Sequence, residues 1–210
     1  MKKEIEAVFI NIDKNKLRTK LKELGAKLIV PERKMIRTVF KTDNPATKQR
    51  SFLRVRDEGD KTVVTYKKFL DSTVTGVREI NVVVDSYDNA VELFRVLELH
   101  EKSYEESLRE TWEYNGAEID IDTWPWLSTY VEIEGSSVEN MTTTAQKLGF
   151  KMEDAIFDSV GKIYELYYDV SETDINTGKN GWSRIEFVPT PEWLESRRRP
   201  EPLAPHPASQ

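Results

Sequence analysis

Long stretches of this chain alternate between apolar and polar residues with a period of two, which is typical of β-strands that have one buried face. The clearest case is Glu118–Gly135, where acidic residues alternate with isoleucine and valine on both sides of a turn at Thr123–Trp126. The same pattern predicts strands over 3–12, 33–41, 50–56, 62–68, 77–85 and 104–114. With the two arms of the hairpin, eight strands are predicted.

Between these strands, apolar residues recur at the three- and four-residue spacing of amphipathic helices. The first predicted helix begins after Asp13, a capping residue, and ends at Gly25. Further helices are predicted over 85–101, over 136–149 and within 156–170. The helix over 136–149 opens with a capping box from Ser136 to Glu139. The chain is therefore predicted to be an α+β protein.

The composition predicts one main domain followed by a tail. The chain has 210 residues, of which 38% are hydrophobic, and this is enough for a single core. Six of its nine prolines lie from Pro189 onward. We therefore expect a domain over 1–175, a C-terminal extension of it over 176–188, and a proline-rich, disordered tail over 189–210.

The residues that are scarce exclude several kinds of chemistry. The chain has no cysteine, so it has no disulfide, thiolate nucleophile or zinc–thiolate site. Its two histidines, His100 and His206, lie in a predicted helix and in the tail, which argues against a histidine-based triad. Any metal would be held by carboxylates, and these favour Mg²⁺ or Mn²⁺.

The charge and the hydropathy pattern bear on location and partners. The net charge of −6 argues against a general nucleic-acid binder. No run approaches the roughly 20 apolar residues of a membrane helix, and the N-terminus lacks the apolar core of a signal peptide. We expect a cytoplasmic protein without a membrane or nucleic-acid partner.

The charged residues of the predicted strands are sorted by sign. In six of the eight strands, charged residues stand at positions i and i+2 with aliphatic residues between them. Some strands carry acidic residues only on this face and others basic residues only. The acidic positions are Glu4, Glu6, Asp120, Asp122, Glu132 and Glu134, and the basic positions are Arg54, Arg56, Lys67 and Arg109.

Two placements of this charged face satisfy the alternation. In a one-sided sheet, the charged face meets water. Alternatively, because about eight strands suffice to close a barrel, helices on the apolar face would leave the charged residues lining a lumen. The sorting by sign favours the lumen, since an acidic wall and a basic wall together fit a divalent cation and a phosphate chain.

The ordered set of motifs over roughly residues 3–170 resembles the CYTH family, the triphosphate tunnel metalloenzymes. This family includes class IV adenylyl cyclases, thiamine triphosphatases and inorganic triphosphatases. The motifs that carry the resemblance are Glu4-Ile5-Glu6, Arg54-Val55-Arg56, Thr65-Tyr66-Lys67, Ser107-Leu108-Arg109, Asp122 and Glu132-Ile133-Glu134.

The resemblance implies an eight-stranded antiparallel β-barrel, or tunnel, with helices packed outside. It implies a metal site for Mg²⁺ or Mn²⁺ on four glutamates, a phosphate site on four cations, and three catalytic carboxylates. The implied metal ligands are Glu4, Glu6, Glu132 and Glu134, the implied phosphate ligands are Arg54, Arg56, Lys67 and Arg109, and the implied catalytic residues are Glu4, Glu6 and Asp122.

The implied activity is metal-dependent hydrolysis of a triphosphate: tripolyphosphate, thiamine triphosphate or a nucleoside triphosphate such as ATP. The alternative enzyme is a class IV adenylyl cyclase, which converts ATP to cyclic AMP and pyrophosphate. The chain departs from the family pattern at Val8 and Ser107, where lysines are expected, and at Asn81, where an acidic residue is expected. These departures favour a third hypothesis, a degenerate tunnel that binds a phosphorylated ligand without turnover. A fourth is a sheet with a charged surface and an unrelated partner.

Overall fold

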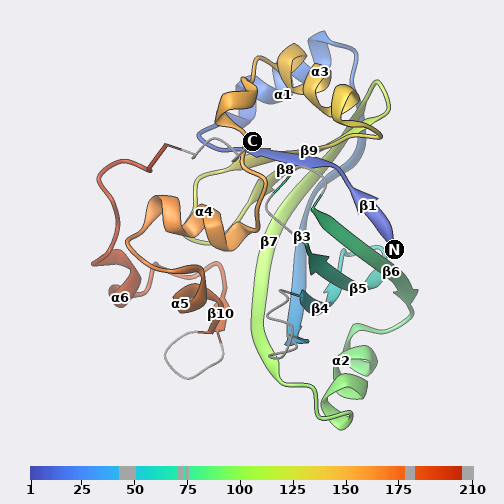
Figure 1. Ribbon diagram of the computed structural model, residues 1–210, viewed down its shortest axis with the longest axis vertical. Coiled ribbons are helices and arrows are strands. Elements are labelled where there is room, and N and C mark those ends of the chain that lie inside the picture. The colour runs from blue at the N-terminus through green and yellow to red at the C-terminus, as the bar shows by residue number, and fades with distance from the viewer. Residues whose placement is uncertain (43–50, 71–72, 74–75, 178–182, 205–210) are drawn as a thin grey trace.

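The computed structural model describes residues 1–42, 51–70, 73, 76–177 and 183–204. Within these ranges, ten strands form one sheet in the order β1-β6-β5-β4-β3-β7-β8-β9-β2, and β10 pairs in parallel with β7 (Figure 1). The strands are β1 (Lys2–Glu4), β2 (Glu6–Phe9), β3 (Lys27–Lys41), β4 (Ser51–Asp57), β5 (Thr62–Phe69), β6 (Val77–Val84), β7 (Glu101–Tyr114), β8 (Ala117–Thr123), β9 (Tyr130–Glu134) and β10 (Ser183–Ile185). The helices are α1 (Lys14–Glu23), α2 (Tyr87–Val96), α3 (Val138–Leu148), α4 (Val160–Tyr167), α5 (Glu172–Thr177) and α6 (Glu192–Glu195), with a 3-10 turn, η1, at Met152–Asp154. None of the helices in the described ranges is long and apolar enough to cross a membrane.

All eight predicted strands are present, and the α+β class with a large antiparallel sheet is confirmed. The first predicted strand is divided at Ile5, because β1 pairs with β6 while β2 pairs with β9. These pairings place β1 and β2 at the two ends of the strand order. The ladder of hydrogen bonds therefore does not close into a ring, and the chain itself joins the two ends through Ile5. Arg50, the expected start of the third predicted strand (50–56, observed as β4), lies outside the described residues.

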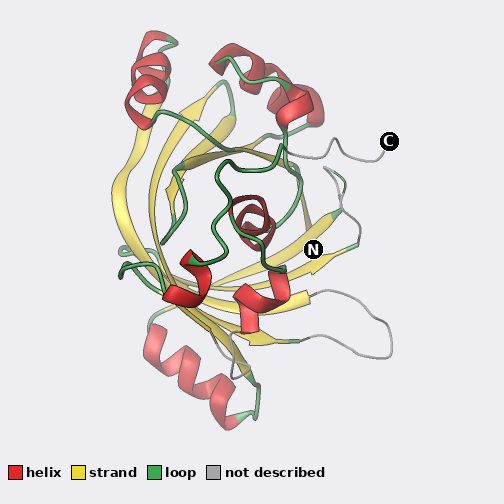
Figure 2. Ribbon diagram, turned by 90° about the vertical axis from the view of Figure 1, so that its left-hand side faces the viewer, coloured by secondary structure: helices red, strands yellow, loops and turns green. Residues whose placement is uncertain are grey.

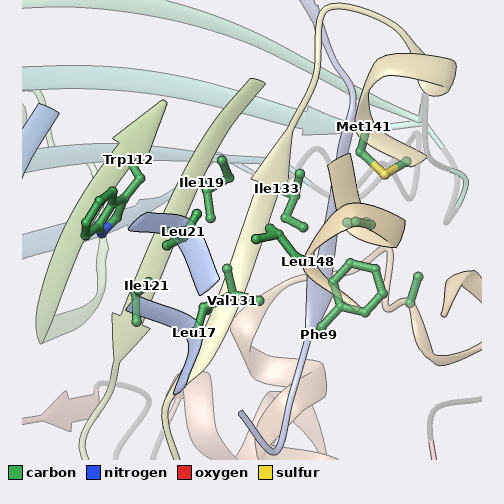
Figure 3. Packing of buried hydrophobic residues seen from close by; sticks show 13 residues of the cluster. Phe9, Leu17, Leu21, Trp112, Ile119, Ile121, Val131, Ile133, Met141 and Leu148 are labelled. Carbon is green, nitrogen blue, oxygen red and sulfur yellow. The ribbon is translucent and has the colours of Figure 1, made fainter. Parts of the chain in front are cut away.

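The apolar outer face of one half of the sheet is covered by α1 and α3 (Figures 1 and 3). Leu21 of α1 and Met141 of α3 are fully buried. They lie in one cluster with Ile119 of β8 and Ile133 of β9. Capping defines α1 as predicted, since the Asp13 side chain accepts hydrogen bonds from two backbone amides of the first turn. These two helices therefore lie outside the sheet, and the acidic residues Asp120, Glu132 and Glu134 of β8 and β9 point inward. The expectation that the helices pack outside does not hold for α4 (Val160–Tyr167), which packs on the inner face of the sheet against Val8 and Tyr130.

The other half of the sheet is covered by α2, which is shorter than predicted. Ala90 and Val91 of α2 pack in a second cluster with Val55 of β4. The helix ends at Val96 because the chain adopts a positive φ of 61° at Glu98 and turns into β7. Leu97, the C-cap residue of this helix, is 61% exposed.

The expected disordered tail is ordered over the part that the structure describes, residues 189–204. Leu194 of α6 is fully buried in a third cluster, which also contains Tyr164 of α4 and Ile185 of β10. Backbone hydrogen bonds tie the segment to the end of α4, from the Arg199 amide to the Tyr167 carbonyl among others. The prediction of disorder rested on the proline content, which does not reveal these contacts. Residues 205–210 lie outside the described ranges. The division of the chain at 175 and 188 stays a prediction.

Candidate functional site

The inner face of the curved sheet borders a cavity of about 930 Å³. Figure 2 looks at the molecule from the side of α4, and the strands curve around that helix. The N-terminal turn of α4 and part of α5 also border the cavity. Strand alternation brings eight of the nine predicted site residues into its lining: Glu4, Glu6, Arg54, Arg56, Lys67, Arg109, Glu132 and Glu134. The ninth, Asp122, is fully buried behind Arg109.

Two acidic residues lie on either side of the break at Ile5, and one lysine holds both. The Lys67 Nζ atom is 2.6 Å from Glu4 Oε2 and 3.3 Å from Glu6 Oε1. Burial and the neighbouring charge of Glu6 raise the pKa of Glu4 to about 8, although the charge of Lys67 acts in the opposite direction. Burial likewise raises the pKa of Glu6. The Lys67 ammonium group therefore lies where a metal cation would bind these two carboxylates.

Arg109 is held by three carboxylates from β8 and β9. Its Nε donates to Asp122 Oδ1 at 2.8 Å, its Nη1 to Asp120 Oδ2 at 2.6 Å, and its Nη2 to Glu132 Oε2 at 2.5 Å. Burial raises the pKa of Asp122 to about 7 and that of Asp120 to about 6 despite the charge of Arg109. Burial also acts to raise the pKa of Glu132, but the charges of Arg109 and Lys67 outweigh it and lower that pKa.

The acidic and basic walls, which are separate along the sequence, are therefore paired with one another in space. Lys67 and Arg109, two of the four expected phosphate ligands, are both occupied by carboxylates. A phosphate group would have to replace carboxylate oxygens at both cations. Conversely, when Lys67 or Arg109 moves away, the carboxylate oxygens that it held can bind another cation.

Arg54 and Arg56 have different surroundings, although they stand on the same strand face. Arg56 donates through Nε to Glu58 Oε1 at 2.8 Å. No ion pair is found for Arg54 within the described residues; its Nη2 lies 3.3 Å from the Thr65 hydroxyl, which donates to Asn81. Asn81, the departure from the acidic pattern, thus extends a hydrogen-bond chain from Arg54. Burial and the charge of Arg56 lower the pKa of Arg54.

The two missing lysines have different structural explanations. Val8 is 3% exposed and packs in the cluster of α4, and its backbone is paired with Ile156. Ser107 is fully buried in β7, and its hydroxyl accepts a hydrogen bond from an arginine of the neighbouring strand β3, Arg37. A lysine is therefore replaced by packing at the first position and by another cation at the second.

Arg37 is a site residue that the sequence analysis missed. It borders the cavity, is 4% exposed, and stands opposite Arg56 in the β3–β4 pairing. Its guanidinium lies over the Trp124 ring, 4.5 Å from the centroid. Burial and the charge of Arg56 lower the pKa of Arg37 to about 10. The alternation of the predicted strand 33–41 could have found it, because Arg33 and Arg37 share one face there.

The residues of the acidic wall fit a hard divalent cation in kind, because they offer only carboxylate oxygens. The pKa values of Glu4 and Glu6 are raised because burial and neighbouring carboxylates disfavour their ionised forms. A bound cation would favour the ionised forms and so relieve this penalty. In the described ranges, however, no three histidine, aspartate or glutamate side chains are grouped so that they could hold a metal ion.

Comparison with known proteins gives the family. The model of the CYTH domain family matches residues 2–167, whereas no curated protein matches the chain. The PH1012 protein of Pyrococcus horikoshii has a similar structure, with a TM-score of 0.64 and 24% identity over 74% of this chain and 96% of its own. A conserved hypothetical protein of Pyrococcus furiosus has a TM-score of 0.64 and 22% identity over 74% of this chain and 96% of its own.

A third solved structure supports the same fold. It is a Vibrio parahaemolyticus protein provisionally named an adenylate cyclase, with a TM-score of 0.67 and 12% identity over 78% of this chain and 98% of its own. Because the match to the family model spans most of the chain, the resemblance of the motifs is confirmed. The chain belongs to the CYTH domain family, which binds triphosphate substrates and whose enzymes typically use divalent metals.

Proposed function

We propose that this protein is a metal-dependent enzyme that hydrolyses a triphosphate: tripolyphosphate, thiamine triphosphate or a nucleoside triphosphate. The observation that supports this most directly is the cavity of about 930 Å³, whose lining joins buried carboxylates of raised pKa to guanidinium groups. A triphosphate and a divalent cation together satisfy both kinds of group.

In this proposal, Glu4, Glu6, Glu132 and Glu134 hold Mg²⁺ or Mn²⁺, and Arg54, Arg56, Lys67 and Arg109 bind the phosphates. The bound metal would neutralise charge on the non-bridging phosphate oxygens. Lys67 and Arg109 would change partners, from carboxylate to phosphate, as metal and substrate enter. Such preorganised cations favour the charge that develops in phosphoryl transfer.

The proposed role of Asp122 is to position Arg109 rather than to touch the substrate. Asp122 is fully buried, does not border the cavity, and accepts from Arg109 Nε at 2.8 Å. This bond orients the guanidinium so that its two Nη atoms point toward the other carboxylates of the wall. An Asp122→Asn substitution should therefore raise KM for the substrate more than it changes metal affinity.

Adenylyl cyclase activity is the second candidate. The family includes such cyclases, and the Vibrio parahaemolyticus protein of similar fold carries that provisional name. In a cyclase, the ribose 3′-hydroxyl attacks the α-phosphorus of ATP and pyrophosphate leaves. The same walls would serve both reactions, so the products distinguish them.

The test is an incubation with tripolyphosphate, thiamine triphosphate or ATP and Mg²⁺ or Mn²⁺, with the products separated by ion-exchange chromatography. Chelator-sensitive release of phosphate supports the hydrolase, and cyclic AMP with pyrophosphate supports the cyclase. Lys67→Gln should reduce the rate strongly. Lys68→Gln is the matched control, since the Lys68 side chain projects from the opposite face of the same strand. If no substrate is consumed but tripolyphosphate binds, the protein is a binding module instead.

A further inference from the structure

Three buried N–H groups that border the cavity have no acceptor among the residues that the structure describes. They are Nε of Arg37, Nε of Arg54 and Nε1 of Trp124. A buried donor without a partner costs about 1–3 kcal/mol, and native proteins hold few of them. Three such donors around one cavity indicate a ligand that accepts hydrogen bonds.

The charges around these donors indicate that the ligand is an anion. Within the described residues, neither Arg37 nor Arg54 has a carboxylate at ion-pair distance, in contrast to Lys67 and Arg109. Arg56, the neighbour of both, is neutralised by Glu58. The carboxylate nearest in register to Arg37 is Glu105, which accepts a hydrogen bond from Ser103 at 2.5 Å instead. Two guanidinium groups without an ion pair in the described residues therefore border the same cavity.

Arg37 also contacts the residue that stands where the motif pattern expects a cation. Its Nη2 donates to the hydroxyl of Ser107, the residue at which the motif pattern expects a lysine. The cation–π contact with the Trp124 ring also holds the Arg37 guanidinium at this place. Trp124 is itself held in the cluster of α4, where the Tyr164 hydroxyl donates to the Pro125 carbonyl at 2.7 Å. The group is therefore rigid and lies on the α4 side of the cavity.

We propose that Arg37, Arg54 and Trp124 form an anion subsite for one phosphate group of the substrate, with Arg37 in place of the lysine absent at position 107. This inference deepens the proposed function and rests on it for the identity of the ligand as a triphosphate. A guanidinium fork and an indole N–H match the oxygens of a tetrahedral phosphoryl group. The subsite would set the position of the phosphate chain along the cavity.

The first experiment measures binding of tripolyphosphate to the full chain by calorimetry, with chelator and separately with Mg²⁺. Arg37→Gln should weaken binding by about ten- to a hundredfold, since it removes hydrogen bonds from a charged donor. Trp124→Phe keeps an aromatic ring under Arg37 but removes the N–H, and should weaken binding by a smaller factor. Arg95→Gln on the outer helix α2 is the matched control and should bind as the wild type does.

The second experiment restores the cation from the neighbouring strand. The double variant Arg37→Gln/Ser107→Lys should regain most of the affinity that Arg37→Gln loses. Near-ultraviolet circular dichroism shows whether each variant is folded, and if Arg37→Gln does not fold, Trp124→Phe and Arg37→Lys carry the test. Wild-type affinity in both Trp124→Phe and a folded Arg37 variant would overturn the subsite.

These outcomes separate the subsite from the proposed function. Tripolyphosphate binding that depends on Arg37 in a protein without turnover supports the subsite and contradicts the enzyme. Turnover with binding that is indifferent to Arg37 and Trp124 supports the enzyme and contradicts the subsite.

Discussion

Glu4 is predicted to make the metal-free protein less stable as the pH rises. Its side chain is buried, 7% exposed, and burial with repulsion from Glu6 raises its pKa from 4.5 to about 8. Between these two values the folded protein holds a proton on Glu4 that the unfolded chain has lost. Stability must then fall as the pH rises through this window, by about 1.4 kcal/mol for each pH unit.

The size of the effect follows from the same two pKa values. From pH 4.5 to 7, the ionisation of Glu4 in the unfolded chain should lower the free energy of unfolding by roughly 3 kcal/mol. Above pH 8 the loss levels off, because Glu4 then ionises in both states. Glu4→Gln removes the titrating group at nearly constant shape, and it also removes the charge that repels Glu6. The variant should therefore be more stable than the wild type at pH 8 when no metal is present.

The assay is urea unfolding of the wild type and of Glu4→Gln with chelator, at intervals from pH 5 to 9. Across this range, the free energy of unfolding of the wild type should fall more steeply with pH than that of the variant. The difference in slope should be about 1.4 kcal/mol for each pH unit up to pH 8. Asp120 and Asp122 titrate in both proteins and so cancel in the comparison. Parallel curves would refute the reasoning. With Mn²⁺ the wild type should regain stability at high pH, whereas the variant should regain less.

Three further substitutions test the packing and the charge balance. Arg109→Gln should lower the free energy of unfolding by about 3–5 kcal/mol, because it leaves buried carboxylates without their cation; urea unfolding should show almost no change for the exposed control Arg95→Gln. Gly161→Ala should lower the free energy of unfolding by about 1 kcal/mol by the same measurement, because a Cβ there would overlap the Glu172 side chain and this cost exceeds the gain in helix propensity. A more stable variant would contradict the close contact of Gly161 with Glu172. Leu194→Ala should cost about 2–5 kcal/mol, since Leu194 is fully buried; an unchanged melting temperature would mean that the C-terminal segment is not part of the folded unit.

Alternation along the strands was enough to predict which face of the sheet carries the charges. A strand side chain has only two directions, so Arg54 and Leu53 could be assigned to opposite faces from their positions alone. The pairing of Lys67 with Glu4 and Glu6 could not be predicted in this way. It depends on how far the sheet curves and on which strands meet at Ile5, and neither quantity is local in sequence.

Two other features could not be predicted from the sequence, each for a different reason. Arg37 was missed because its strand matches no motif, although its alternation with Ile36 and Thr38 was visible; only the fold shows that it faces Ser107 and Trp124. The C-terminal segment was interpreted from its prolines. The burial of Leu194 and the backbone hydrogen bonds to the end of α4 hold this segment in place. Both depend on residues that are distant in the sequence, so no local pattern predicts them.

The division of the first strand at Ile5 has a consequence for how the protein folds. Glu4 belongs to a strand that pairs with β6, and Glu6 to a strand that pairs with β9. During synthesis the N-terminal residues emerge first, yet the partner of Glu6 is Glu134, far along the chain. Contacts of this separation are slow to form, because the intervening chain must be ordered before they add stability. The two neighbouring carboxylates would thus meet only when the sheet is nearly complete, so the ability to bind a cation would mark one of the last steps of folding.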